Sequence, residues 1–547
     1  MNFSPHAFLN SNLKGIDMKR ILKMNTHQCN RVLFLCMTVL GFTGCGTVPK
    51  NLGTFEPDSI VVVDGRGRLM QPVGNAGQNR YTSLWAMKST VPLDREEKYV
   101  QAVAENIKRQ LEDGRDVVVY IHGGLNLQRT SMERAAALRD WPTGPRSSSE
   151  PYILPINWQS SLYSSYRDNL FFIREGKDYR DRGGGSVLWG VLTSPIVLFR
   201  DTVGMVGSAP YVWERNMANY LVGAFPSTYE DRISDRTLQD FYFEWHQGQG
   251  HLPESALPDQ KTGDLGSLLS TVFTPIRMVS SPFVRSFGEP AWDIMRRRTT
   301  LMFHRPPFDL HAGPEWTEGV MSKLGAQFVE VTHHMQTETY KSLLEDKTED
   351  SDPKLILVCH SMGAIIGSKL LRLYPEMKFD DIVFMGAACT VRDVGEYVLP
   401  YLAKHRETEF FNLTLHPKNE VRENNWLFIA PRGSLLVYID NMLVHPDNLL
   451  DRTAGRYENF AMSLPYLQEE AERLASRYAD LTADDLRKRV YLRTFPYGRN
   501  FETYVPRKHG HFSQFNFWQR SFYDPTATYI GFNLKENPTP AIMRITP

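Results

Sequence analysis

A strand that runs into a serine-containing turn and then a helix constrains this chain more than any other stretch. Residues 355–358 are branched and apolar, which predicts a strand buried on both faces of a parallel sheet. Small and apolar residues over 363–371 suit a helix packed on such a sheet. Between them, Ser361 lies in the sequence Cys-His-Ser-Met-Gly. A serine on such a turn projects its hydroxyl above the sheet, so the stretch predicts a nucleophile elbow. The alternative is a strand–turn–helix in which the serine is incidental.

The turn departs from the usual pattern, G-x-S-x-G, at one position. Cys359 stands where the first glycine is expected. A small thiol side chain fits where two elements approach closely, so the departure weakens the match without breaking it.

A second glycine-containing loop follows another apolar strand, predicted over residues 116–121. This strand leads directly into His122, Gly123 and Gly124. Glycines at the carboxyl end of a strand allow backbone N–H groups to point into an active site, as in the loop that supplies an oxyanion donor in lipases and esterases. A tight turn after a core strand is the alternative.

Strands and helices alternate along much of the chain, which predicts a mostly parallel sheet with helices on both faces. The other predicted strands are residues 59–63, 152–158, 381–386, 409–415 and 489–495. Predicted helices cover residues 94–112, 130–141, 316–344 and 395–404.

The elbow, the glycine loop and the order of the strands resemble the α/β-hydrolase superfamily, and the general appearance is that of a bacterial serine-esterase-like or lipase-like lipoprotein. The resemblance covers roughly half of the chain. It implies a doubly wound sheet of α/β-hydrolase type, with a large helical insertion after the fourth core strand and a second insertion before the last strand. The divisions expected are a leader (1–45), hydrolase portions (46–173, 315–430 and 487–547) and insertions (174–314 and 431–486).

The resemblance also implies the chain order nucleophile, acid, histidine. The acid is expected just beyond the strand that ends at Leu415, where Glu420 is the first candidate and Glu423 stands behind it. Asp393, in the loop after the preceding strand, is the alternative.

The histidine is expected in a loop after the last strand. His509 is the first candidate because a glycine follows it, and His511 is the second. His122 and His360 flank the two site loops and are expected to shape them.

Together these residues imply a serine hydrolase that acts on a carboxylic ester, small or lipidic, without cofactor or metal. Ser361 would attack the carbonyl carbon, and the backbone N–H groups of Met362, Gly123 and Gly124 would form the oxyanion hole. A catalytically inactive protein of the same fold, serving as a binding or scaffold protein, is the alternative.

The first residues of the chain form a predicted export signal. Basic residues up to Arg31 precede an apolar run over 32–42, and Cys45 follows a small-residue stretch. This end resembles a bacterial lipobox, which implies a lipidated Cys45 and a membrane anchor at the periplasmic face of the outer membrane. An ordinary signal peptide or an anchor helix is the alternative.

The charge balance and the cysteines exclude other classes of function. Basic and acidic side chains both number 62, so no charge excess indicates nucleic-acid binding. Three of the five cysteines fall in the leader, and the spacing of the remaining pair, Cys359 and Cys389, suggests neither a disulfide framework nor a metal site.

The predicted insertion 174–314 carries apolar blocks at residues 187–192 and 195–199. Pro195 interrupts them, which disfavours a membrane span. We expect a lid or an interfacial helix that covers the site and lines an apolar acyl pocket. The alternative is a buried helix of an accessory subdomain.

Overall fold

The structure is a computed structural model. It describes residues 59–70, 93–126, 128–139, 150–174, 177–182, 184–224, 265–305, 317–345, 352–423, 432–495 and 505–525. Every described residue lies within 53–547, which forms one compact unit. The predicted leader and Cys45 therefore lie outside the described residues.

Seven parallel strands form the central sheet. They are β1 (Val61–Val63), β2 (Val117–Ile121), β3 (Tyr152–Trp158), β8 (Leu355–His360), β9 (Asp381–Met385), β10 (Glu409–Leu415) and β11 (Val490–Phe495). Their spatial order is β1-β3-β2-β8-β9-β10-β11, with every neighbouring pair parallel. The predicted α/β fold with a mostly parallel sheet is confirmed.

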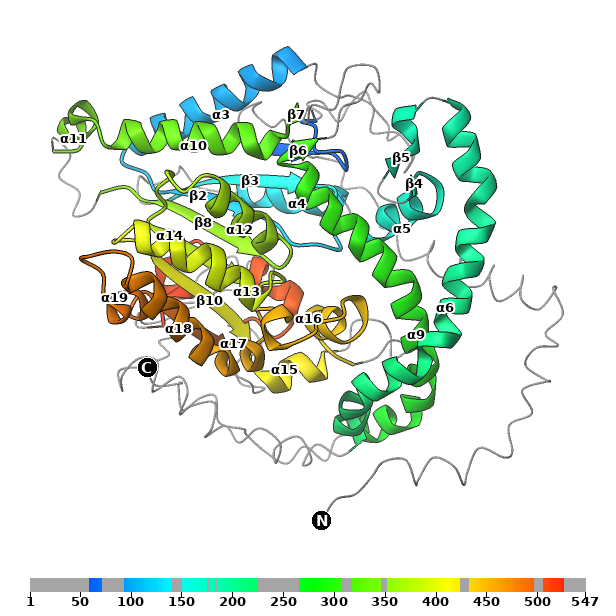
Figure 1. The fold of residues 1–547 in the computed structure, drawn as a ribbon. Helices are drawn as coiled ribbons and strands as arrows, with labels where there is room; N and C mark the ends of the chain where they lie inside the picture. The colour runs from blue at the N-terminus through cyan, green and yellow to red at the C-terminus, as the bar shows by residue number, and fades with distance from the viewer. Residues whose placement is uncertain are drawn as a thin grey trace, which may run out of the picture. The chain divides into compact units, whose positions relative to one another are not determined.

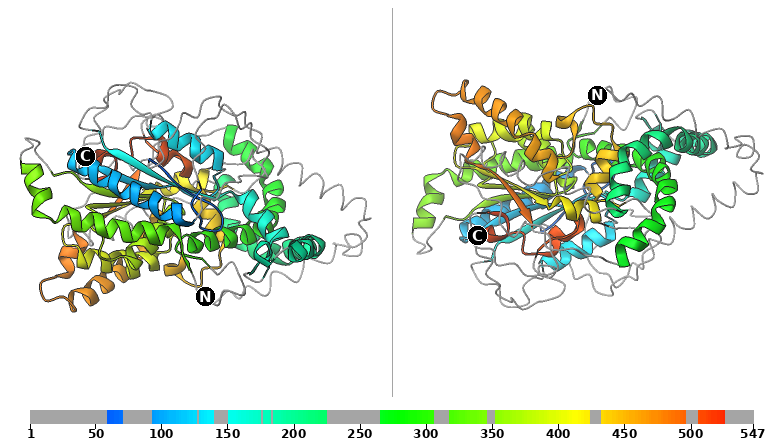
Figure 2. Two further views of the ribbon diagram at one scale, coloured as in Figure 1. Left: turned by 90° about the horizontal axis from the view of Figure 1, so that it is seen from above. Right: turned by 90° about the horizontal axis from the view of Figure 1, so that it is seen from below.

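Helices cover both faces of this sheet because its strands are apolar on both sides (Figures 1 and 2). One face packs on α3 (Leu93–Glu112), α10 (Val320–Met335), α12 (Gly363–Leu373) and α14 (Leu399–Lys404). The other face packs on α4 (Gln128–Arg139), the turn η8 (His509–Gln514) and α20 (Arg520–Tyr523). Side chains of β2 alternate between the two cores, with Val117 and Val119 in one and Val118 and Tyr120 in the other.

The connections place the ends of β2 and β8 beside each other. From β2 the chain moves outward to β3, and later it returns across the sheet to β8 on the opposite side of β2. In open α/β sheets, ligands bind at the carboxyl ends of two strands whose connections diverge in this way.

The approach of α12 to the sheet accounts for Cys359. A Cβ atom added to Gly363 would lie 2.3 Å from the carbonyl oxygen of Ile121, and one added to Gly367 would lie 2.5 Å from Cys359 Sγ. The glycine at 367 thus makes room for the thiol under the helix. The turn after β8 tolerates Cys359 because of this space.

The segment between β3 and β8 contains two long helices, α6 (Gly184–Ala224) and α9 (Leu265–Leu301), which pack on each other. A buried ion pair of 2.9 Å between Arg298 and Asp168 joins α9 to α5 (Leu162–Phe171). The segment follows the third strand of the sheet, so its expected position after a fourth strand is wrong. The next strands in the chain, β4 (Ile173–Arg174) and β5 (Lys177–Asp178), form a separate antiparallel pair.

The segment before β11 is also helical. It contains α16 (Leu435–Tyr438), α17 (Tyr457–Met462), α18 (Leu464–Ala475) and α19 (Ala483–Arg487). Between β10 and this segment, the short helix α15 (Pro417–Arg422) carries the residues predicted to include the acid.

Candidate active site

Ser361 occupies a strained turn directly after β8. Its φ angle is +54°, in the left-handed region that costs a non-glycine residue about 1–3 kcal/mol. The turn is held from outside, since the Ser361 N–H donates to the carbonyl of Met385 (2.9 Å) and its carbonyl accepts from Ala388 N–H (3.0 Å). The neighbouring strand β9 and the loop after it therefore fix Ser361 in a left-handed turn between β8 and α12.

His509 is the histidine that the structure places on Ser361. Its Nε2 lies 2.8 Å from Ser361 Oγ, within hydrogen-bonding distance. Gly386, at φ +52°, allows this approach, because a Cβ atom there would lie 3.0 Å from His509 Nδ1. His511 follows on the same turn η8 but makes no hydrogen bond to Ser361. Of the two candidates, geometry selects His509.

Two further histidines shape the site loops, as the sequence suggested. The ring of His360 stacks on that of His509 at 5.2 Å between centroids, and its Nε2 lies 3.0 Å from the His509 carbonyl oxygen. His122 Nδ1 donates to the Gly123 carbonyl (2.7 Å), and its Nε2 accepts the N–H of Trp158 (3.0 Å). These hydrogen bonds fix the loop after β2 and the backbone of His509. None of them involves Ser361 Oγ or a ring nitrogen of His509.

The predicted acids lie elsewhere, and both assignments are corrected. Burial raises the pKa of Glu420, and its carboxylate accepts from Arg456 Nε at 3.2 Å. Asp393 caps a helix, accepting the N–H of Thr390 at 2.8 Å. Within the described part of the chain, no carboxylate is hydrogen-bonded to the ring of His509. Glu420 and Asp393 are predicted from their positions just beyond a strand. Such a position does not determine where the side chain points.

Glu423, the second acid candidate, does contact His509, through the backbone. Its Oε2 accepts the His509 N–H at 2.9 Å, and both side chains are buried. Glu423 directly follows α15, and Glu420 on that helix forms an ion pair with Arg456. The Arg456–Glu420 pair thus holds the helix that presents Glu423 to the histidine turn. Arg456 has no signal in the sequence, because its separation from Glu420 follows no local spacing rule.

Backbone donors stand beside Ser361 without acceptors. The N–H groups of Met362 and Gly124 donate to no acceptor among the described residues. A Cβ atom on Gly123 would lie 2.7 Å from the Ser361 Cβ, and one on Gly124 would lie 2.4 Å from Met362 Sδ. Both glycines are needed for this close approach. Unpaired buried N–H groups beside a serine are the kind of donors that stabilise an oxyanion.

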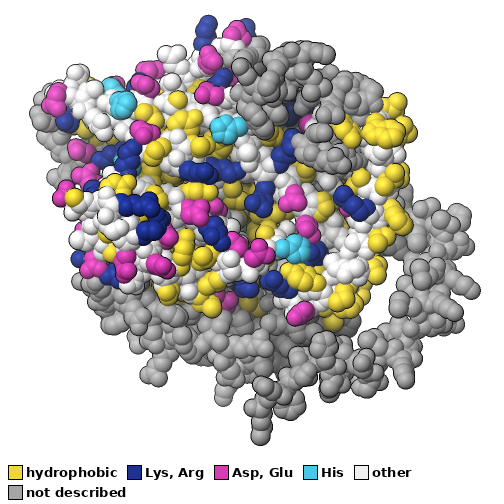
Figure 3. All heavy atoms as spheres, in the orientation of Figure 1, with side chains coloured by type: hydrophobic (Ala, Val, Ile, Leu, Met, Phe, Trp, Pro, Cys, Tyr) yellow, Lys and Arg dark blue, Asp and Glu magenta, His cyan; other side chains and the backbone are white. Residues whose placement is uncertain are grey.

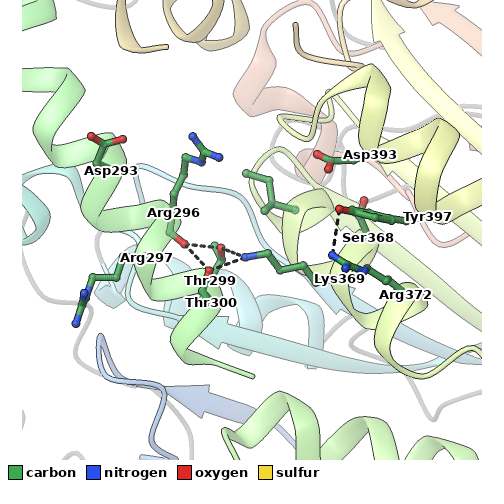
Figure 4. Close-up of a pocket in the computed structure, with 11 residues that line it drawn as sticks. Asp293, Arg296, Arg297, Thr299, Thr300, Ser368, Lys369, Arg372, Asp393 and Tyr397 are labelled. Atoms are coloured by element: carbon green, nitrogen blue, oxygen red, sulfur yellow. Dashed lines mark hydrogen bonds between the residues drawn. The ribbon is translucent and has the colours of Figure 1, made fainter. Parts of the chain in front are cut away.

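The serine and histidine are enclosed. Ser361 is 1% exposed and His509 is 5% exposed. A separate pocket of about 360 Å³ lies farther along α12, between this helix and α9 (Figure 4). Its wall is mainly polar and charged and includes Arg296, Lys369 and Arg372, and burial lowers the pKa of Lys369 to about 8. This pocket contains neither Ser361 nor His509, so it is not the acyl pocket expected from the sequence.

The predicted lining of an acyl pocket by the apolar blocks of α6 is also wrong. Leu188, Leu192 and Phe199 are each at least 60% exposed on the outer side of the helix. The described residues contain no group of three or more His, Cys, Asp or Glu side chains placed to hold a metal ion.

Comparison of the chain with protein-family models, curated protein sequences and solved structures finds no match.

Burial sets the protonation of His509 and hence an expected pH profile. Desolvation lowers the pKa of His509 from 6.5 to about 4. If His509 acts as a general base it must be neutral, so any hydrolytic activity should persist as the pH falls through 6.5 and be lost only near pH 4. The profile of kcat/KM against pH measures this value in the free protein.

Folding must be monitored in the same experiment. The unfolded chain takes up this proton near pH 6.5, so the lowered pKa reduces folding stability as the pH falls from 6.5 toward 4. Circular dichroism at each pH provides the control. A half-loss of activity near pH 6.5 in folded protein would show that His509 is solvated instead.

Proposed function

We propose that this protein is a serine hydrolase of α/β-hydrolase type that cleaves a carboxylic ester. The observation that carries the proposal is the 2.8 Å approach of His509 Nε2 to the hydroxyl of Ser361 on a turn at φ +54°. Nucleophile and base are within reach of each other, as covalent catalysis by a serine requires.

The proposed reaction begins with the attack of Ser361 Oγ on the carbonyl carbon of the ester. His509 accepts the hydroxyl proton and later donates it to the leaving alcohol, and a water then repeats the sequence to release the acid. The N–H groups of Met362 and of the Gly123–Gly124 loop would bind the oxyanion, and one such donor typically supplies about 3 kcal/mol.

In this proposal the contacts that hold the base, His509, differ from those in a full Ser-His-Asp triad, where a carboxylate is hydrogen-bonded to the histidine ring. Glu423 holds the His509 backbone and His360 stacks on its ring. Neither contact places a carboxylate on the ring itself, and loss of the supporting carboxylate in a serine protease lowers kcat by about 10⁴-fold. From the described residues we therefore infer a slow hydrolase in which Ser361 and His509 carry the reaction.

One alternative has specific support: a catalytically inactive binding or scaffold protein on the same fold. The 1% exposure of Ser361 and the lack of a described carboxylate at the His509 ring both favour it. For either function we propose attachment to a bacterial envelope through Cys45, on the strength of the lipobox-like sequence.

Labelling with a fluorophosphonate, which reacts with activated serines, separates the two functions. We expect wild-type protein to be labelled and Ser361→Ala to remain unlabelled. Ser368→Ala is the matched control, since Ser368 is also buried and lies on α12 but does not contact His509. It should retain labelling. Folded wild-type protein that stays unlabelled would favour the inactive alternative.

A further inference from the structure

Helix α6 carries a row of large apolar side chains that face away from the rest of the protein. Trp189, Leu192, Ile196, Phe199, Val203 and Val206 recur at three- and four-residue intervals, and each is at least 52% exposed. In Figure 3, hydrophobic side chains follow the edge of the molecule where α6 lies. An exposed apolar stripe of this length indicates a surface that contacts something else.

The helix differs from an ordinary core helix of a soluble protein. Within the described residues, Val187–Asn216 is long and apolar enough to cross a membrane, yet only 17% of the most apolar window is buried. It is also far from the N-terminus, so it is not a signal sequence. The stripe has no charged side chain, and Arg200, 63% exposed, stands at its rim.

The opposite side of α6 is buried against the rest of the protein. Val197, Ala209 and Val212 are buried, and α6 packs on α9 and α5. Asp201 on this side is 5% exposed and accepts a hydrogen bond from the hydroxyl of Tyr166 on α5 (3.0 Å). Crossing a bilayer would carry this carboxylate and the packed helices into hydrocarbon, at a high cost. The geometry therefore favours a helix that lies along a surface.

We propose that the exposed stripe of α6 docks on a lipid bilayer, with the helix parallel to the membrane plane. Interfacial helices present an apolar face to the acyl boundary and keep charged residues at the rim, where Arg200 stands. Covalent lipid and the burial of an apolar helix face at the acyl boundary each add to membrane affinity. The stripe would supply a membrane contact in addition to the proposed lipid at Cys45. This inference does not depend on the proposed catalytic function.

The test uses Trp189 as a native reporter of depth. The full chain is reconstituted into phosphatidylcholine–phosphatidylglycerol vesicles that contain lipids brominated either near the headgroup or near the bilayer centre. The Trp189 signal is the difference between wild type and Trp189→Phe. We expect loss of Trp189 emission that is stronger with bromine near the headgroup. Trp292, which is 1% exposed on α9, should not be quenched in the same difference measurement against Trp292→Phe.

Other outcomes would overturn the proposal. No quenching by either lipid would show that the stripe does not enter the bilayer. Trp189 stands at one end of Val187–Asn216, so a spanning helix is recognised with Val203→Trp, near the middle of that stretch, whose emission would then be quenched more strongly from the bilayer centre. Disulfide-linked dimers of Phe199→Cys would assign the stripe to a second copy of the chain. Ser361→Ala should give the wild-type quenching pattern, so failure of the catalytic proposal and failure of this one are distinguishable.

Discussion

Replacing His509 by alanine is expected to lower ester hydrolysis by about 10³-fold or more, whereas His511→Ala should retain activity within about twofold. His509 Nε2 lies 2.8 Å from Ser361 Oγ, and no other described side chain is hydrogen-bonded to this hydroxyl. Without the imidazole, the serine has no base to accept its proton. Steady-state hydrolysis of an activated ester by the two variants measures the difference.

His511→Ala is also the control for folding in that experiment, since both residues belong to the turn η8. Thermal unfolding of the two variants should show that each is folded at the assay temperature. Equal activity of His509→Ala and wild type would remove His509 from the reaction. Loss of activity in His511→Ala alone would transfer the role of the base to that residue.

Replacing Arg456 by leucine is expected to lower the free energy of unfolding by about 3 kcal/mol, near the low end for breaking a buried ion pair. Arg456 donates from Nε to Glu420 (3.2 Å) and from Nη1 to Asp440 (3.1 Å), and both carboxylates are buried. Leucine would leave both without the guanidinium. The expected loss of unfolding free energy is near the low end of that range, because burial raises the pKa of Glu420. Its carboxylate can therefore take up a proton when the guanidinium is removed.

Arg392→Leu is the matched control for that measurement. Arg392 pairs with Asp451 at 2.9 Å, but both side chains are substantially exposed, so the pair is expected to contribute at most about 1 kcal/mol. Urea denaturation of both variants gives the comparison. Similar losses would mean that the Arg456 cluster is not a buried structural unit.

The same cluster links stability to the site. Arg456 holds Glu420 on α15, and Glu423, just beyond that helix, accepts the N–H of His509. An Arg456→Leu protein that remains folded should therefore also hydrolyse ester more slowly.

Local features of the sequence were sufficient to predict most of the sheet and the elbow turn. Branched apolar runs and a serine between a strand and a helix carry their signal within a few residues. Cys359 departs from the usual pattern, and the reason lies eight residues later, at Gly367. Chain order alone limited the histidine to a short loop, but only the geometry distinguished His509 from His511.

The features that sequence could not predict depend on contacts between distant residues. The pairing of Glu420 with Arg456 has no signature in spacing, so a structural carboxylate was interpreted as the catalytic acid. The apolar blocks of α6 were visible in the sequence. Which side of the helix would be covered, however, depended on α9, which lies far along the chain. The expectation of a pocket wall was wrong for this reason, while the interfacial position remains a proposal.

The most direct measurement of the central claim is the site of the fluorophosphonate adduct. Labelled full-length protein is digested, and the modified peptide is identified by mass spectrometry. We expect the adduct on Ser361, with its formation slowed in His509→Ala and unchanged in His511→Ala. An adduct on a different serine, or no adduct on folded protein, would contradict the assignment of Ser361 as the nucleophile.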